Sequence, residues 1–226
     1  MSLKKYLLAA VLVGSCVTAG AAVAQQPLDL RYQMTFNNKR MGQQSFKIAT
    51  LADGANSYQV DTTTMIDFSP FPLVNVKVNQ TTQEVWKNGA LAGFTSSTNE
   101  RGDDFTVKAA SNGQGIQVQG TEKGKQKVSE TLPTDAVPRS WWLESLFMTR
   151  KQGFDIKSGK AEPVAASLVG EEMADYHGQQ VKVRHYKETK GDSDTGNDKD
   201  LYFLETGILY RLSYQAQGNK IVHTLQ

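Results

Sequence analysis

The chain has 226 residues, of which 39% are hydrophobic, and its 25 basic side chains nearly balance its 23 acidic ones. Two of the basic residues lie in residues 1–24, which contain no acid, so the remaining 202 residues carry 23 side chains of each sign. A neutral balance disfavours a nucleic-acid binder, which needs a clustered basic face, and a polybasic protein of the membrane surface. About 200 residues are enough to bury the core of one all-β domain. We therefore expect a single domain over residues 25–226 and no nucleic-acid partner.

The first 24 residues have the pattern of a secretory signal peptide. Lys4 and Lys5 form a charged start, an apolar run follows over residues 6–13, and residues 22–24 (Ala-Val-Ala) place small side chains where signal peptidase reads them. Later in the chain, no stretch approaches the roughly 18 apolar residues that a transmembrane helix needs. The sequence predicts export to the periplasm and no transmembrane helix.

Cys16 is the only cysteine of the chain and lies inside this leader. Residues 13–16, Val-Gly-Ser-Cys, also fit a bacterial lipoprotein processing site, at which the cysteine becomes the acylated first residue. Residues 17–24 are apolar, unlike the polar tether of a lipoprotein, so we favour a cleaved signal peptide. An outer-membrane lipoprotein anchored through Cys16 is the alternative. Without cysteine, residues 25–226 have neither disulfides nor thiolate metal sites.

After the leader, the pattern of the first half of the chain predicts β-strands. Apolar and polar residues alternate from Leu28 to Phe36, which is the period of a half-buried strand. Asn88-Gly89 is the clearest hairpin signal, because both central positions of a type I′ turn need positive φ. The same alternation recurs near residues 46–48, 58–66, 74–86, 91–98, 105–109 and 116–118.

One segment breaks this rhythm, because residues 140–151 carry large apolar side chains at helix-like spacing. Ser140 is a plausible N-cap and Gly153 a plausible residue after the helix end. Strands then resume near residues 154–156, 164–170, 180–188, 201–204, 208–214 and 221–225. This order predicts an all-β fold, an antiparallel meander curled into an open or closed barrel, with one amphipathic α-helix as lid or plug.

A set of motif positions is scattered along the chain: Glu84, Trp86, Asn88, Gly89, Leu91, Thr95–Asn99, Gly102, Pro138, Ser140, Trp142, Gly170, Leu201, Tyr202 and Leu209–Ile221. In these positions the chain resembles an uncharacterised family of bacterial cell-envelope proteins. The resemblance covers nearly all of residues 28–226, and it implies no activity. In strand order and size the chain is also similar to the open β-barrels that carry lipoproteins or lipids through the periplasm.

No motif in the chain indicates catalysis or a metal. His177, His185 and His223 lack any recognised ligand spacing, and nucleophile-elbow, phosphate-loop and dinucleotide motifs are absent. The acidic loop 190–198 has oxygen ligands for calcium, but it lacks the glycine and the bidentate glutamate of an EF-hand, so we interpret it as a solvated hairpin loop. We expect no metal, no cofactor and no enzymatic activity.

Glu84 and Trp86 are the first candidate binding residues. An unbroken strand from Val74 to Trp86 puts the Glu84 carboxylate on the apolar face, where an unpaired charge is costly. A salt bridge to Arg139 or another base at the barrel end would satisfy it. The functional alternative is a polar anchor in an otherwise apolar ligand cavity.

Trp141, Trp142 and Leu146 complete the candidate set. Adjacent positions of a helix lie about 100° apart, so we expect one tryptophan in the core and the other exposed at a rim, where a ligand or partner would meet it. Two hypotheses follow. The first is a carrier of an apolar small molecule or lipid under a helical lid, and the second is an envelope interaction module with a fully packed core and a protein partner.

Overall fold

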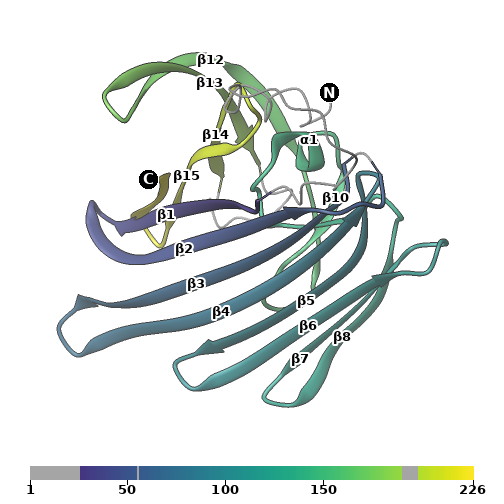
Figure 1. Ribbon diagram of the computed structural model, residues 1–226. Coiled ribbons are helices and arrows are strands. Elements are labelled where there is room, and N and C mark those ends of the chain that lie inside the picture. Colours follow the sequence, from purple (N-terminus) through teal and green to yellow (C-terminus); the bar gives the residue numbers. More distant parts are fainter. Residues whose placement is uncertain (1–25, 55, 190–197) are drawn as a thin grey trace, which may run out of the picture.

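The computed structural model describes residues 26–54, 56–189 and 198–226 (Figure 1). The predicted signal peptide and Cys16 lie outside this part of the chain. Most of the described chain forms a strongly curled antiparallel sheet that is built largely as a meander. Its first eight strands are β1 Leu28–Phe36, β2 Lys39–Thr50, β3 Tyr58–Phe71, β4 Val74–Lys87, β5 Ala90–Glu100, β6 Asp103–Ser111, β7 Ile116–Glu122 and β8 Lys125–Leu132.

The last five strands of the chain complete the same sheet. The C-terminal strand pairs with β1, so the sheet order runs from β12 through β16 and β1 to β8. β12 and β8 form its two edges and do not pair with each other, so the curled sheet is open. This confirms the predicted all-β meander. The strands are β12 Ala166–Tyr176, β13 Gln179–Glu188, β14 Lys199–Leu204, β15 Leu209–Ala216 and β16 Asn219–Leu225.

Binary patterning explains which face of each strand is buried. In β4 every second residue from Val76 to Trp86 is more buried than its neighbours, so Thr82, Glu84 and Trp86 all face inward. At the β4–β5 turn, Asn88 and Gly89 both have positive φ, at 52° and 77°, as the hairpin signal predicts.

Residues 133–165, which we call the plug, fill one end of the curled sheet. The plug contains a small three-stranded sheet of β9 Val137–Pro138, β10 Gln152–Phe154 and β11 Ala161–Pro163, and the helix α1 Glu144–Phe147. Aromatic rings from the sheet meet aromatic rings from the plug edge to face, as in the pairs Phe94–Phe154 and Trp86–Phe147. The backbone of the plug also approaches the sheet closely, because a side chain at Gly120 would collide with the carbonyl oxygen of Ser158.

The predicted helix over residues 140–151 is wrong in length, since α1 is a single turn. Trp141 has a left-handed backbone with φ 57°, and Leu143 is extended and forms an isolated bridge with Ile208, just before β15. The helical period misled the prediction because the sheet surrounds the plug. Apolar residues are then buried at consecutive positions whatever the local backbone does. Ser140 is not the N-cap and Gly153 lies in β10, so neither predicted boundary holds.

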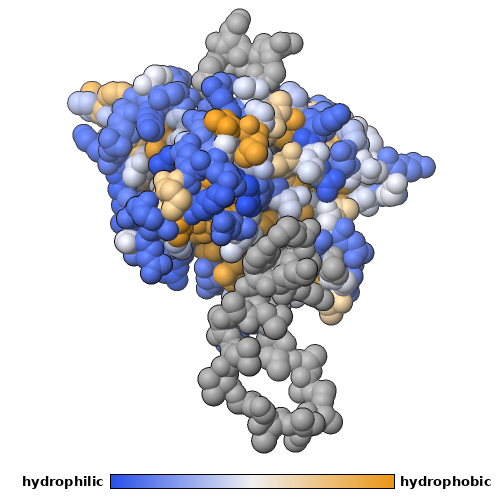
Figure 2. Space-filling model, turned by 90° about the horizontal axis from the view of Figure 1, so that it is seen from above, coloured by the Kyte–Doolittle hydropathy of each residue, from blue (hydrophilic) through white to orange (hydrophobic). Residues whose placement is uncertain are grey.

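The face that Figure 2 shows is largely hydrophilic, with small hydrophobic patches. Within the described ranges, no helix has the length and hydropathy needed to cross a bilayer.

Candidate functional site

Glu84 forms the centre of a buried cluster with Trp86 and Trp142, which we call the Glu84 cluster. The carboxylate oxygen Oε2 accepts hydrogen bonds from the indole Nε1 of Trp86 at 2.8 Å and from that of Trp142 at 3.1 Å. All three side chains are at most 1% exposed. One carboxylate thus ties strand β4 to the plug.

Burial raises the pKa of Glu84, because the ionised form loses its hydration. Ser140 and the two indole N–H groups oppose part of this shift, although the Ser140 hydroxyl falls short of hydrogen-bond geometry to the carboxylate. Among the described residues, the second oxygen, Oε1, has no hydrogen-bond partner. The site therefore favours a protonated carboxyl group, which is what a buried polar anchor in a packed interior requires.

Arg139 does not pair with Glu84, so the predicted salt bridge between them is wrong. Its guanidinium binds Glu162 and Glu188 instead, and Lys199 reaches Glu188 at 3.2 Å. The Arg139 and Glu188 side chains are 8% and 2% exposed. This buried ion network joins the plug to strands β13 and β14, across positions that lie far apart in the chain.

The expectation that one of the adjacent tryptophans is exposed at a rim is also wrong. Trp141 and Trp142 are 3% and 1% exposed. They can both point inward because the backbone at Trp141 is left-handed rather than helical. Trp141 lies near the Arg139 guanidinium and the Lys199 amine, at 5.4 and 5.5 Å from its ring centre, and Leu146 is buried in the same core. The six predicted site residues thus form two buried structural groups.

A band of polar side chains crosses the inner face of the sheet next to the Glu84 cluster. Thr62, Thr82 and Ser96 stand side by side on β3, β4 and β5, because each is the register partner of the next. A second row lies two residues further along the strands, where Gln80 donates to Thr98 at 2.8 Å and Gln44 donates to Thr64 at 3.2 Å. We call the following residues the polar band: Gln44, Thr62, Thr64, Gln80, Thr82, Ser96, Thr98 and His223.

Four atoms of the polar band lack hydrogen-bond partners within the described residues. They are the hydroxyl oxygens of Thr62, Thr82 and Ser96 and the Nε2 nitrogen of His223, and each of these residues is less than a tenth exposed. Buried polar groups are normally paired, so unpaired ones gathered in one band are where a further polar atom, from water or from a ligand, would hydrogen-bond.

Beyond the polar band lies a second, smaller apolar cluster, separate from the main core. Met34, Met41 and Ile221 are its buried members, and Ile66 and Phe68 of β3 pack against it half-buried. We call this group the distal apolar cluster. The inner face of the sheet therefore alternates from apolar to polar to apolar along its strands, which is the pattern that an amphiphilic molecule would match.

Sequence reasoning missed the polar band, although its signal was present. Polar residues occupy the inward positions of three consecutive strands, and the stretch Thr95–Thr98 is polar on both faces. That stretch lies in β5, which pairs on both sides, so it is not an edge strand. Only the register shows that its inward hydroxyls align with those of β3 and β4.

His223 makes stability depend on pH in a defined direction. Burial lowers its pKa from 6.5 to about 4, and the positive charge of Lys199 adds to the shift. The folded chain holds the ring neutral while the unfolded chain protonates it below pH 6.5. The stabilisation is complete above that pH and is lost as the pH falls towards 4. We expect a loss of about 3 kcal/mol from this group, measured by urea unfolding at pH 7 and pH 4.

The variant His223→Gln isolates this contribution, because it keeps a polar side chain that cannot titrate. Its stability should fall less than that of the wild type over the same pH interval. Equal pH dependence of the two proteins would contradict the assignment.

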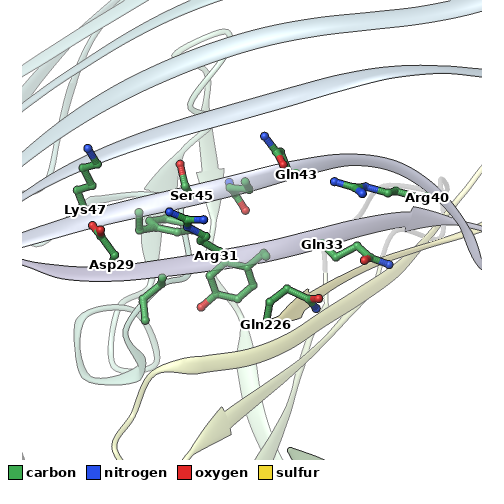
Figure 3. Close-up of a pocket in the computed structure, with 12 residues that line it drawn as sticks. Asp29, Arg31, Gln33, Arg40, Gln43, Ser45, Lys47 and Gln226 are labelled. Atoms are coloured by element: carbon green, nitrogen blue, oxygen red, sulfur yellow. The ribbon is translucent and has the colours of Figure 1, made fainter. Parts of the chain in front are cut away.

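A separate cleft of about 510 Å³ lies on the outer face of β1 and β2 (Figure 3). Its polar side chains come as cross-strand register partners, with Asp29 opposite Lys47 and Arg31 opposite Ser45. The lining supplies amides, a hydroxyl and three basic groups against one acid, which suits a polar or anionic solute. These outward polar positions look like an ordinary solvated face in the sequence.

The histidines lie apart in the structure, and no cluster of metal-ligand side chains forms within residues 26–54, 56–189 and 198–226. His185 lies on the outer face between Glu172 and Asp200, at 2.8 and 2.9 Å, and stacks on Tyr202. The acidic loop 190–198 lies outside the described residues except Asp198, which pairs with Lys187.

An open, curled antiparallel sheet with a plug at one end defines a β-barrel-like protein. Residues 32–226 match the model of a domain of unknown function, DUF6134, and the chain belongs to this family. The fold is similar to the crystal structure of a beta-barrel-like protein of the domain of unknown function DUF1849 from Brucella abortus, with a TM-score of 0.63 and 13% identity over 91% of this chain and 98% of that chain. No curated protein matches the sequence.

Proposed function

We propose that this protein is a non-catalytic periplasmic binding protein for an amphiphilic, lipid-like molecule. The observation that carries the proposal is the set of unpaired, buried polar atoms in the polar band, next to the distal apolar cluster. A hydrogen-bonding head group would satisfy the band, and an apolar chain would cover the half-buried side chains beyond it. The signal-peptide pattern at the N-terminus supports the periplasmic location.

This site replaces the one expected from sequence. The two tryptophans hydrogen-bond to Glu84 within the packed core, so in this proposal the three residues lie next to the ligand site and do not contact the ligand. The packed plug favours a second candidate function, an envelope interaction module that binds a protein partner and no small ligand.

The test measures binding of a fluorescent fatty acid and a fluorescent lysophospholipid to the purified protein. Thr82→Val and Ser96→Ala each remove one unpaired hydroxyl with little change in volume. We expect each to weaken probe binding by about two- to tenfold, because one hydrogen bond is lost. The melting temperature of each variant should be unchanged or higher, since an unsatisfied buried group is removed.

Thr81→Val is the matched control, because Thr81 is exposed on the outer face of the same strand. It should leave the probe affinity unchanged. The proposal fails if the wild type binds neither probe, or if the inward and outward variants bind alike. Absence of binding would favour the interaction module.

A further inference from the structure

The β3–β4 hairpin forms the edge of the sheet at the end where the β1–β2 hairpin also turns (Figure 1). The last β2–β3 pair is Gly42 with Ile66, and the last β4–β5 pair is Val78 with Glu100. Strand pairing of the hairpin with β2 and β5 therefore ends at Ile66 and Val78, but Phe68 still packs against the distal apolar cluster, with its ring centre 5.1 Å from that of Phe36. Three residues separate Phe68 from the end of β3, which corresponds to roughly 10 Å of projection.

Apolar side chains cover the tip of this hairpin and face solvent. Phe71 is 56% exposed, Leu73 is 107% exposed and Val74 is 40% exposed. Large apolar side chains at this tip are not buried in the core of their own domain, so they do not stabilise it. Exposed apolar groups of this kind mark a surface that another phase or molecule covers.

The turn itself carries an unusual residue. Leu73 follows Pro72 and has φ 66°, a left-handed conformation that favours glycine or asparagine. Other tight hairpin turns in the described chain use polar residues or glycine at the same kind of position. They are Asn37-Asn38, Asn88-Gly89, Arg101-Gly102, Lys123-Gly124, His177-Gly178 and Gln217-Gly218. Leucine at position 73 is thus favoured neither by the left-handed backbone nor by the exposure of its side chain to water.

Basic side chains surround the base of the hairpin. Arg40 and Lys77 line one depression on the outer face with Met65 and Asp67. The backbone N–H of Arg101 donates to the carbonyl of Lys77, which places the β5–β6 turn beside the same base.

The balance of charge at this base is positive. Lys77 has Asp67 at 3.9 Å, whereas no ion pair within the described residues engages Lys39, Arg40 or Arg101. Of the nearby acids, Glu100 and Asp103 are paired with Lys157 and Lys123, and Asp104 accepts a hydrogen bond from Asn99.

We propose that the β3–β4 hairpin inserts its tip into the surface of a bilayer that contains anionic phospholipid. Leu73 lies four residues, or roughly 13 Å, from Lys77 along the strand. The apolar tip can therefore enter the boundary between head groups and acyl chains, about 5–10 Å deep, while the basic base stays at the phosphates. Contact with a second copy of the chain or with another protein would not explain why the apolar side chains lie at the tip and the basic ones at the base. The inference does not depend on the proposed ligand.

The test is flotation of the purified protein with vesicles of phosphatidylcholine alone and of phosphatidylcholine mixed with phosphatidylglycerol. We expect the wild type to bind the mixed vesicles more strongly and to lose binding as salt is raised. The double variant Phe71→Ser/Leu73→Asn removes the apolar tip, and asparagine suits the left-handed position. It should reduce partitioning by about ten- to a hundredfold.

Met173→Asn is the matched control, because Met173 is another exposed apolar residue, 62% exposed, on edge strand β12. It should partition as the wild type does. The inference fails if the wild type does not bind anionic vesicles, if the double variant binds as well as the wild type, or if Met173→Asn loses as much. It also fails if the only effect of the double variant is to convert a dimer of the protein into monomers. Probe binding in solution without vesicles tests the proposed function separately, so the two can fail independently.

Discussion

Replacing Glu84 by leucine should lower the free energy of unfolding by about 2–6 kcal/mol. The carboxylate accepts from both Trp86 and Trp142 in a fully buried site, so leucine leaves two indole N–H groups without an acceptor. Each unsatisfied buried donor costs about 1–3 kcal/mol. Urea unfolding at neutral pH measures the loss.

Glu84→Gln is the informative partner of this variant, because its amide oxygen can accept from both indoles and carries no charge. Burial raises the pKa of Glu84, so the folded wild type retains a proton that the unfolded chain releases. The stability that this proton confers is complete below pH 4.5 and is lost as the pH rises through the folded-state pKa. Glu84→Gln should therefore gain stability relative to the wild type between pH 5 and pH 8. If the leucine and glutamine variants are equally stable, the two indole hydrogen bonds do not stabilise the Glu84 cluster.

Replacing Arg139 by methionine should cost about 3–5 kcal/mol, because it leaves buried carboxylates without their cation. Glu188 would retain Lys199, while Glu162 would lose the guanidinium that binds it. The double variant Arg139→Met/Glu188→Gln should lose less stability than the sum of the losses in the two single variants. The double variant should recover part of the stability, since one of the two carboxylates that Arg139 binds is then neutral.

The control for this network is Lys87→Met, which breaks the exposed pair of Lys87 with Asp53. Both side chains are more than half exposed, so water screens the pair and its loss should be much smaller. Equal losses for Lys87→Met and Arg139→Met would show that burial does not set the strength of the Arg139 network. Thermal unfolding of Arg139→Met, Glu188→Gln, their double variant and Lys87→Met makes the comparison.

The strand pattern could be read from the chain because one face of the sheet is buried along most of its length. Alternation along β4 is enough to predict that Glu84 and Trp86 lie on the inner face, and the residue pair Asn88-Gly89 locates the turn that follows. Both signals are local, since a strand's period and a turn's φ angles depend on neighbours in sequence.

The candidate site could be predicted only in part. Glu84, Trp86 and Trp142 do come together, but as a hydrogen-bonded core cluster, and Arg139 belongs to a different network. The partner of a buried charge is chosen by strands that lie far away in sequence. Arg139 meets Glu188, 49 positions later, and nothing local distinguishes that pairing from one with Glu84.

What the sequence by itself determined was the all-β class, the inward face of its long strands and the chemistry of their turns. The tertiary structure alone decided that residues 140–151 form a plug with a one-turn helix, because a segment enclosed by a sheet buries apolar side chains on every side. Register alone aligned Thr62, Thr82 and Ser96 into one band, since pairing across strands sets which inward residues become neighbours. The exposed tip at Leu73 likewise follows from tertiary structure, because it projects only where the neighbouring strands end before it.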